Sequence, residues 1–419
     1  MIEYVIKGGN KLIGTTYVSG SKNSSLPIIA ACILNGKRNV LYNIPKINDV
    51  EVMLEILEKI GCDITREENR IIIDSKNINT TIIPKYLMEK LRASIIIVGA
   101  LLSRFKNAEF SYPGGCNIGL RPIDLHINNL KKLGTTFYIK DNLIKCVREK
   151  EVSKRIYLEF PSVGATENLI LSSVIGKEKV VLYNTAMEPE ISDLCIFLNK
   201  MGANIEGIGT STIIINGVNY LNETSYLVMP DRIEAGTLMA AVAITEGTAV
   251  IENINYHHME KVIDKFIDIG CIIEKYDQKI RIISNNKLKS TNIETAPYPG
   301  FPTDMQPIFA SVLSSCIGES IISEKIFEKR FDYTNELRKL GADIKIYDNK
   351  AIIEGKRSLR GATTVSKDLR GGAALVIAGL AAEGKTYVEN IDYILRGYDN
   401  LDIKLNSLGA NIIRKEITY

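Results

Sequence analysis

One short stretch of the chain combines a nucleophilic residue type, a flexible backbone and a fixed positive charge. It covers residues 112–122 and reads YPGGCNIGLRP. Its three glycines allow backbone angles that other residues avoid, and a proline near each end stiffens it, which predicts a short flap that carries the Cys116 thiol. Arg121 follows five positions later, and a cation beside a thiol favours the thiolate and attracts an anionic substrate. The pattern predicts a reactive cysteine; the alternative is a buried, inert cysteine in a Gly-rich turn.

A second group of candidate residues stands at the starts of six helices that are rich in small and aliphatic side chains. Ser, Thr and Asp at these starts are natural N-caps, and the first helical turn presents unpaired N–H groups and a partial positive charge. Four of the six starts add a cation, namely Lys22, Arg92, Arg232 and Arg370. Gathered around one cleft, these starts would form an anion receptor. Considered one at a time, each helix start could also be an ordinary N-cap whose neighbouring charged side chain is exposed to solvent.

The fifth helix start differs from the others because it adds a carboxylate, Asp304. If cations surround this carboxylate, it should be ionised and could accept a proton, whereas as an N-cap it would do no chemistry. Its position alone does not separate the two roles. Arg330 and Arg396, in the last two repeats of the chain, are further candidate anion contacts.

These helices belong to a unit that occurs six times along the chain. Each copy contains an amphipathic helix that ends in a hydrophobic residue and a glycine, and a strand-like segment follows. The glycines recur at intervals of about 70 residues, at Gly61, Gly134, Gly202, Gly270, Gly341 and Gly409. Each of them fits the position that follows a helix C-terminus, where a left-handed backbone is common.

The second helix of each unit has almost no polar face, which predicts full burial. The six copies cover residues 23–34, 91–103, 166–175, 233–244, 305–317 and 369–382. Each unit is therefore expected to be strand–helix–strand–helix–strand, with one helix inside and one outside. We predict an α/β protein of two similar halves, each with three such units.

Length and composition agree with this organisation. A chain of 419 residues is longer than a single hydrophobic core usually accommodates, so two domains are expected. The charge balance of 52 Lys+Arg against 49 Asp+Glu gives no reason to expect binding to nucleic acid or to a membrane surface. The seven cysteines are scattered without a CxxC pair, which suggests neither a disulfide framework nor a zinc site and favours a reducing compartment.

The N-terminus alternates like a strand and lacks the order of a signal peptide. The longest apolar runs, residues 95–102 and 373–382, are about half the roughly 20 residues needed to cross a bilayer. We therefore expect a soluble, cytoplasmic protein.

The motifs resemble those of the enolpyruvyl transferases, and among these the UDP-N-acetylglucosamine 1-carboxyvinyltransferase family. The resemblance covers nearly the whole chain. It is carried by SGSKN at 19–23, LRAS at 91–94, PGGCNIG at 113–119, RPIDLH at 121–126, PSVGAT at 161–166, PDRIE at 230–234, FPTDMQ at 301–306 and RGY at 396–398. Together these motifs are highly specific.

This resemblance implies a fold and a reaction. The fold would be a pair of inside-out α/β barrels, each of three βαβαββ units. Residues 21–229 would form the domain with the cysteine loop, and residues 1–20 with 230–419 the second domain, which carries the general base. The reaction would move the enolpyruvyl group of phosphoenolpyruvate to the 3-hydroxyl of UDP-N-acetylglucosamine and release phosphate, the first committed step of peptidoglycan biosynthesis. No metal or organic cofactor is implied. A monomer is expected, and an oligomer is left open.

The resemblance also implies roles for single residues. Cys116 would be the general acid that protonates the methylene carbon of phosphoenolpyruvate, and the epoxide antibiotic fosfomycin would alkylate it. Asp304 would be the base that takes the sugar hydroxyl proton. Lys22, Arg121 and Arg396 would hold phosphoenolpyruvate. Further substrate-binding positions are Asn23, Arg92, Pro122, Ile123, Asp124, Leu125, Ser162, Val163, Gly164, Ile326, Arg330 and Arg370.

The chain departs from the family pattern at several positions, among them the unusual segment FDY at 331–333. Lys329 stands where the family usually has Asn, and Phe160 where some relatives have a lysine near the uridine. Ser24 and Ser25 replace typical alanines in the first buried helix. These departures concern the fine geometry of nucleotide binding rather than the reaction.

Two other functions fit part of the pattern. The related transferase that acts on shikimate 3-phosphate shares the sixfold repeat but works without a loop cysteine like Cys116. A catalytically idle relative that binds a UDP-sugar as a sensor or scaffold would not need Cys116, Asp304 and Lys22 together, although the Lys329 departure is compatible with it.

Overall fold

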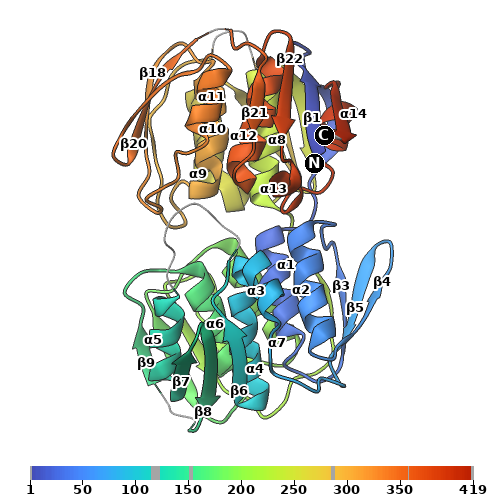
Figure 1. Ribbon diagram of the computed structural model, residues 1–419, viewed down its shortest axis with the longest axis vertical. Helices are drawn as coiled ribbons and strands as arrows, with labels where there is room; N and C mark the ends of the chain where they lie inside the picture. The colour runs from blue at the N-terminus through green and yellow to red at the C-terminus, as the bar shows by residue number, and fades with distance from the viewer. Residues whose placement is uncertain (1, 115–122, 151–153, 285–287, 357, 417–419) are drawn as a thin grey trace. The chain divides into compact units, whose positions relative to one another are not determined.

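The computed structural model describes residues 2–114, 123–150, 154–284, 288–356 and 358–416. These residues form two compact units (Figure 1). We call residues 20–114 and 123–229 the middle unit, and residues 2–19 and 230–416 the terminal unit, each with the gaps just given. In the described residues the strands form six separate sheets, three in each unit, rather than one closed barrel. The predicted α/β class is confirmed.

The middle unit is built around three inner helices, and further helices flank them. The inner helices are α1 (Lys22–Ala31), α4 (Ile96–Phe105) and α6 (Val163–Ser173). The flanking helices are α2 (Asn48–Lys59), α3 (Lys85–Lys90), α5 (Asp124–Lys132) and α7 (Pro189–Lys200). A 3-10 turn, η1 (Arg92–Ile95), leads into α4.

The three inner helices run in the same direction. At their C-terminal ends, Arg104 Nη1 donates to the Ile33 carbonyl at 2.8 Å, and the Ile175 N–H donates to Ser103 Oγ at 3.4 Å. Near the N-terminal ends, Asn168 Nδ2 donates to the carbonyl of Ile95 at 3.0 Å. The starts of the three helices therefore gather at one end of the unit.

Small sheets cover these helices. Their orders are β13-β3-β5-β4, β6-β8-β7 and β11-β12-β10-β9. The strands are β3 (Arg38–Tyr42), β4 (Asp63–Arg66), β5 (Arg70–Asp74), β6 (Asn107–Ser111), β7 (Thr135–Lys140), β8 (Leu143–Arg148), β9 (Lys154–Tyr157), β10 (Lys179–Tyr183), β11 (Asn204–Glu206), β12 (Thr212–Asn216) and β13 (Ser225–Leu227).

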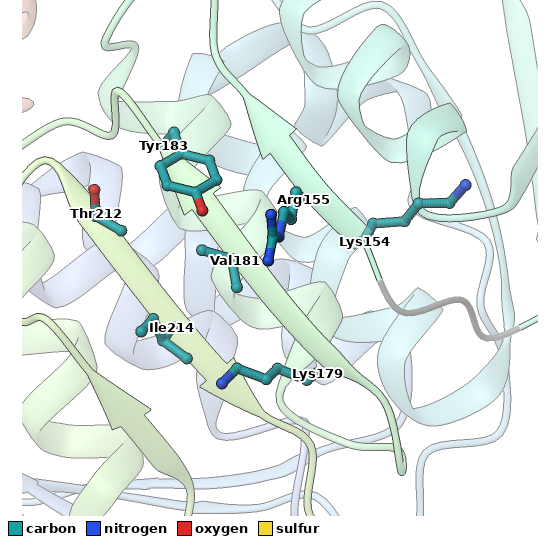
Figure 2. Close-up of a pocket in the computed structure, with 7 residues that line it drawn as sticks. All are labelled: Lys154, Arg155, Lys179, Val181, Tyr183, Thr212 and Ile214. Atoms are coloured by element: carbon teal, nitrogen blue, oxygen red, sulfur yellow. The ribbon is translucent and has the colours of Figure 1, made fainter.

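One sheet of the middle unit carries a hollow of about 500 Å³. Figure 2 shows that its lining side chains come from the neighbouring strands β9, β10 and β12. The lining consists of Lys154, Arg155, Lys179, Val181, Tyr183, Thr212 and Ile214. None of the predicted site residues is among them, so this hollow is separate from the site that the sequence predicts.

The terminal unit repeats the same plan. Its inner helices are α8 (Arg232–Ile244), α10 (Gln306–Leu313) and α12 (Leu369–Ala381). The other helices are α9 (Glu260–Asp268), α11 (Thr334–Lys339), α13 (Asp392–Leu395) and α14 (Leu401–Ser407), with the 3-10 turns η2 (Tyr256–Met259) and η3 (Thr303–Met305).

The sheets of the terminal unit have the orders β21-β22-β1-β23, β15-β16-β14-β2 and β17-β18-β20-β19. The strands are β1 (Ile2–Lys7), β2 (Ile13–Tyr17), β14 (Thr248–Glu252), β15 (Ile272–Tyr276), β16 (Lys279–Ile283), β17 (Ile293–Glu294), β18 (Gly318–Ser323), β19 (Asp343–Tyr347), β20 (Lys350–Gly355), β21 (Thr363–Val365), β22 (Lys385–Glu389) and β23 (Ile412–Glu416).

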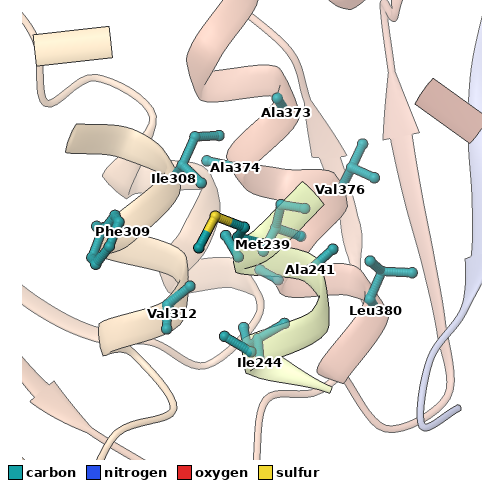
Figure 3. Close-up of a cluster of buried hydrophobic side chains, with 14 of the residues drawn as sticks. Met239, Ala241, Ile244, Ile308, Phe309, Val312, Ala373, Ala374, Val376 and Leu380 are labelled. Atoms are coloured by element: carbon teal, nitrogen blue, oxygen red, sulfur yellow. The ribbon is translucent and has the colours of Figure 1, made fainter. Parts of the chain in front are cut away.

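The core of the terminal unit lies between its three inner helices. Figure 3 shows Met239 of α8, Phe309 of α10 and Val376 of α12 among the side chains that pack there. All residues of α8 are buried, as its lack of a polar face predicts. Close packing of this kind fixes the relative positions of the helix starts, which carry the candidate site residues.

The six repeat glycines adopt the predicted conformation. Their φ angles are 107° at Gly61, 85° at Gly134, 101° at Gly202, 104° at Gly270, 90° at Gly341 and 101° at Gly409. These values lie in the left-handed region that favours glycine after a helix C-terminus. Each amphipathic helix therefore ends where the repeat predicts.

Within the described residues the chain passes between the two units twice, and a strand comes just before each passage. Strand β2 precedes α1 but pairs in parallel with β14 of the terminal unit. Strand β13 precedes α8 but pairs in parallel with β3 of the middle unit. The passages lie at Ser19–Gly20 and Met229–Pro230, because the two units divide there.

Buried polar contacts hold the chain on either side of these passages. In the terminal unit, the Ser19 N–H donates to Glu234 Oε2 at 2.8 Å, and Lys404 binds both residues. In the middle unit, the Met229 N–H donates to Asp193 Oδ2 at 3.3 Å, and Ser24 Oγ donates to the same carboxylate oxygen. The Ser24 departure from the family pattern thus has a partner in this fold.

Several predicted helix bounds are wrong by a few residues. The helix predicted at 166–175 begins three residues earlier, at Val163, because Ser162 caps it. The helices predicted at 91–103 and 305–317 begin as the 3-10 turns η1 and η3 rather than as α-helix. No helix in the described ranges is long and apolar enough to cross a membrane.

The inner helix α6 carries a buried carboxyl group that should make stability pH-dependent. Burial, and then Glu190 and Glu188, raise the pKa of Glu167 well above its usual range. Because the folded pKa exceeds the unfolded value, this group stabilises the fold at low pH, and that contribution is lost as the pH rises through the folded pKa.

We therefore expect Glu167→Gln to raise Tm at pH 8 but not at pH 5, by about 2–4 °C for each kcal/mol of relief. Calorimetry of both proteins at both pH values measures this. The same Tm difference at pH 5 and pH 8 would contradict the expectation.

Candidate active site

Asp304 in the terminal unit lies between two arginines. Its Oδ1 accepts from Arg330 Nη2 at 2.9 Å, and its Oδ2 accepts from Arg370 Nε at 3.1 Å. The two arginine side chains are 3% exposed, whereas Asp304 is 28% exposed. Two guanidinium groups stabilise the negative charge of the carboxylate. Asp304 thus has the cationic surroundings that an ionised proton acceptor needs, and no side-chain N-cap bond forms at the start of η3.

The two arginines are held by the elements around them. Arg370 belongs to the first turn of α12, where the Asp368 carboxylate accepts from the N–H groups of Arg370 and Gly371. Its guanidinium lies 5.1 Å above the Tyr398 ring. Burial alone would lower the pKa of Arg370, but Tyr398 and Asp304 outweigh burial and raise the pKa, so the charge persists. Asp304 therefore has two positively charged partners, Arg330 and Arg370.

Each arginine of this ion pair has a buried nitrogen that is not paired. Within the described residues, Arg330 Nε and Arg370 Nη1 are buried without a hydrogen-bond partner. Buried polar atoms are usually paired, so these two donors indicate capacity for a ligand or water.

The remaining predicted residues of this unit lie on nearby segments. The Ile326 N–H donates to Glu324 Oε1 at 2.8 Å. Arg396 follows α13 as its C-cap residue. Lys329, which departs from the family pattern, is exposed beside the buried Arg330, so this departure leaves the Asp304 ion pair in place.

In the middle unit, Lys22 forms a largely buried ion pair. It is the first residue of α1, which Ser21 caps by accepting from the Ser24 N–H. Lys22 Nζ lies 2.7 Å from Asp49 Oδ2 in the first turn of α2. Asn23 follows Lys22 in the same helical turn. The cation is thus held at a helix start, where a partial positive charge adds to its own.

Arg92 holds the beginning of the cysteine stretch. Its Nη1 donates to the Pro113 carbonyl at 3.3 Å, and the Gly114 N–H donates to the Met88 carbonyl at 3.0 Å. A Cβ at Gly114 would lie 2.2 Å from the Glu89 carbonyl oxygen. Close backbone approach requires this glycine, whereas the sequence interpretation proposed an unusual backbone angle, which Gly114 does not have.

The start of α6 lies beside the start of α5. Ser162 Oγ accepts from the Ala165 N–H at 3.4 Å, and Val163 and Gly164 form the first turn. A Cβ at Gly164 would lie 3.2 Å from His126 Cε1. The α5 segment supplies Ile123, Asp124 and Leu125, so these residues and the Ser162 turn share one end of the unit.

Cys116, Arg121 and Pro122 lie outside the described residues. The other six cysteines are described, and all are buried. Burial raises the pKa of Cys62, Cys146, Cys195, Cys271 and Cys316 to about 12 each, and that of Cys32 well above its usual value. These six thiols have the character of inert core residues.

Two residues that contact predicted site residues, Asp49 and Glu324, were not predicted from the sequence. Asp49 pairs with Lys22, and Glu324 binds the Ile326 backbone. No motif marks either residue, because each is defined by what packs against it. In the described part of the chain, no three His, Cys, Asp or Glu side chains are arranged to hold a metal ion.

Comparison with known proteins identifies this arrangement. Residues 6–405 match the family described as EPSP synthase (3-phosphoshikimate 1-carboxyvinyltransferase). UDP-N-acetylglucosamine 1-carboxyvinyltransferase 2 of Caldanaerobacter subterraneus subsp. tengcongensis is 47% identical over 415 residues, with 99% of this chain and 100% of the relative covered. UDP-N-acetylglucosamine 1-carboxyvinyltransferase of Finegoldia magna is 45% identical, with 98% of each chain covered.

Solved structures share the fold. The enolpyruvyl transferase NikO from Streptomyces tendae has a TM-score of 0.90 at 23% identity, with 99% of this chain and 98% of that chain covered. EPSP synthase from Acinetobacter baumannii has a TM-score of 0.76 at 16% identity, with 99% and 100% covered. The protein therefore has the fold of the enolpyruvyl transferases. It belongs to the EPSP synthase family, and within it to the UDP-N-acetylglucosamine 1-carboxyvinyltransferases.

Proposed function

We propose that the protein transfers the enolpyruvyl group of phosphoenolpyruvate to the 3-hydroxyl of UDP-N-acetylglucosamine and releases phosphate. The observation that carries this proposal is the Asp304 carboxylate between Arg330 and Arg370, in a chain that matches transferases of this name over nearly its full length. The product would enter peptidoglycan biosynthesis.

The first half of the reaction is an addition. The Cys116 thiol gives its proton to the methylene carbon of phosphoenolpyruvate, which makes the neighbouring carbon electrophilic. The sugar 3-hydroxyl oxygen then bonds to that carbon and loses its proton to the Asp304 carboxylate. Both carboxylate oxygens accept from arginine, and the Asp304 side chain is 28% exposed whereas the two arginines are 3% exposed, so the carboxylate is the accessible member of the ion pair.

The second half is an elimination. A base takes a proton from the new methyl group, the carbon–oxygen bond to phosphate breaks, and the enolpyruvyl ether remains. Phosphate leaves as an anion, so fixed cations lower the barrier to its departure. We assign this role to Lys22, Arg121 and Arg396, and Lys22 is held for it at the start of α1.

The UDP-sugar would be bound mainly by residues at helix starts of the middle unit. Asn23, Arg92 and Ser162 lie at or beside the starts of inner helices, where N–H groups and partial positive charge favour phosphate oxygens. The further contacts that we propose are Pro122, Ile123, Asp124, Leu125, Val163, Gly164, Ile326, Arg330 and Arg370.

Asp304 belongs to the terminal unit and Lys22 to the middle unit. We propose that residues 21–229 and residues 1–20 with 230–419 are the two domains of a cytoplasmic monomer that works without a metal or organic cofactor.

Phosphate release from phosphoenolpyruvate tests the substrate. We expect release with UDP-N-acetylglucosamine and none with shikimate 3-phosphate. Release with shikimate 3-phosphate alone would assign the chain to the other transferase. Binding of the UDP-sugar without release would indicate a sensor or scaffold.

A further inference from the structure

A second carboxylate, Glu324, is buried next to the segment that carries Asp304. Glu324 follows β18 and is 1% exposed. Its Oε1 accepts from Thr295 Oγ1 at 2.8 Å and from the N–H groups of Ile326 at 2.8 Å and Phe327 at 3.2 Å. Its Oε2 accepts from Thr303 Oγ1 at 2.8 Å. A buried carboxylate with four donors is fixed in place.

These bonds connect the two halves of the Asp304 ion pair. Thr303 is the first residue of η3 and directly precedes Asp304. Phe327 lies under Arg330, with 5.5 Å between the guanidinium carbon and the ring centroid. Glu324 therefore binds the turn that presents the carboxylate and also the segment that presents one of its two arginines.

Side chains hold each residue of the turn η3: Glu324 binds Thr303, the two arginines bind Asp304, and Met305 is fully buried. The turn is a 3-10 turn of three residues, and no side-chain N-cap bond forms at its start. The hydrogen bond from Thr303 to Glu324 therefore has a direct effect on the orientation of Asp304. Since a displacement of about 1 Å can cost roughly 100-fold in rate, such a hydrogen bond has consequences for turnover.

We propose that Glu324, acting through Thr303, is a positioning residue that holds Asp304 in register with its two arginines. The proposal rests on the proposed function, in which Asp304 is the general base. Glu324 does not touch substrate in this account; it acts through the orientation of Asp304.

Thr303→Val tests the proposal because it removes one hydroxyl and nearly keeps the volume. We expect kcat to fall by about 10- to 100-fold with little change in KM. Thr303→Ser, which keeps the hydroxyl, should restore most of kcat. The matched control is Thr295→Val, which removes the other threonine donor to Glu324; it should lower Tm but change kcat less than threefold, since Thr295 does not precede Asp304.

A double-mutant cycle separates positioning from general structural damage. If Thr303 acts through Asp304, Thr303→Val should have almost no further effect on kcat in an Asp304→Asn background. An equal fold-loss of kcat in both backgrounds would overturn the proposal, as would unchanged kcat in Thr303→Val. If Asp304→Asn itself keeps full activity, the proposed function fails instead, so the two failures are distinguishable.

Discussion

Replacing Asp304 by asparagine is expected to lower kcat by about 10²- to 10⁴-fold, the usual range for loss of a general base. The amide keeps the shape of the side chain, and its oxygen can still accept from Arg330. Its NH₂ group would face the Arg370 Nε donor, which now bonds to Oδ2. The variant therefore loses the proton acceptor, the negative charge of both ion pairs and the hydrogen bond from Arg370. Phosphate release under saturating substrates measures kcat directly.

A matched control for this variant is Asp332→Asn. Asp332 is exposed in the same unit, and its replacement removes the same charge without touching the ion pair. We expect its kcat to stay within about twofold of the parent, because exposed charges contribute little. Similar losses in the two variants would mean that overall charge, rather than the Asp304 carboxylate, matters for turnover.

A second large effect is expected in the reactivity of the seven cysteine thiols towards an epoxide. Fosfomycin or another small epoxide is expected to add one group per chain, at Cys116 alone. The six described cysteines are buried with raised pKa values. A thiol with a pKa of about 12 has on the order of one thiolate in 10⁴ at pH 8, and the thiolate is the nucleophile. Intact-mass measurement and peptide mapping locate the adduct.

Cys116→Ser provides the control for labelling and a test of the role. The variant should take up no epoxide, lose turnover by about 10²-fold or more, and bind UDP-N-acetylglucosamine almost as well as the parent by calorimetry. Labelling of Cys32 or Cys195 would remove the case for special reactivity. An equal loss of turnover and sugar binding would instead mean that the stretch is structural.

The sequence predicts the repeat and its glycines well, because both follow from local rules. A helix that ends at Gly202 or Gly341 needs a left-handed residue there, and each of these glycines supplies it. The buried helices are equally clear, because a helix without a polar face cannot lie at the surface. The predicted helix starts are wrong where a capping residue or a 3-10 turn determines where the helix begins, as at Val163 and at η3.

Side-chain pairing is the part that the sequence does not predict. Asp304 lies 26 residues before Arg330 and 66 before Arg370, so their contact depends on how the repeats pack. The pairing of Lys22 with Asp49 has the same origin. Gly114 shows a related failure: its position in a Gly-rich stretch suggested flexibility, but the neighbouring Glu89 backbone leaves no room for a side chain.

In the proposed reaction, a proton is added to the methylene carbon of phosphoenolpyruvate before the sugar ether forms and phosphate leaves. Turnover of phosphoenolpyruvate and UDP-N-acetylglucosamine in D₂O, followed by mass spectrometry of the sugar product, tests this most directly. We predict an enolpyruvyl ether of the UDP-sugar with deuterium on its methylene carbon. An enolpyruvyl product without deuterium, or no such product from these two substrates, would contradict it.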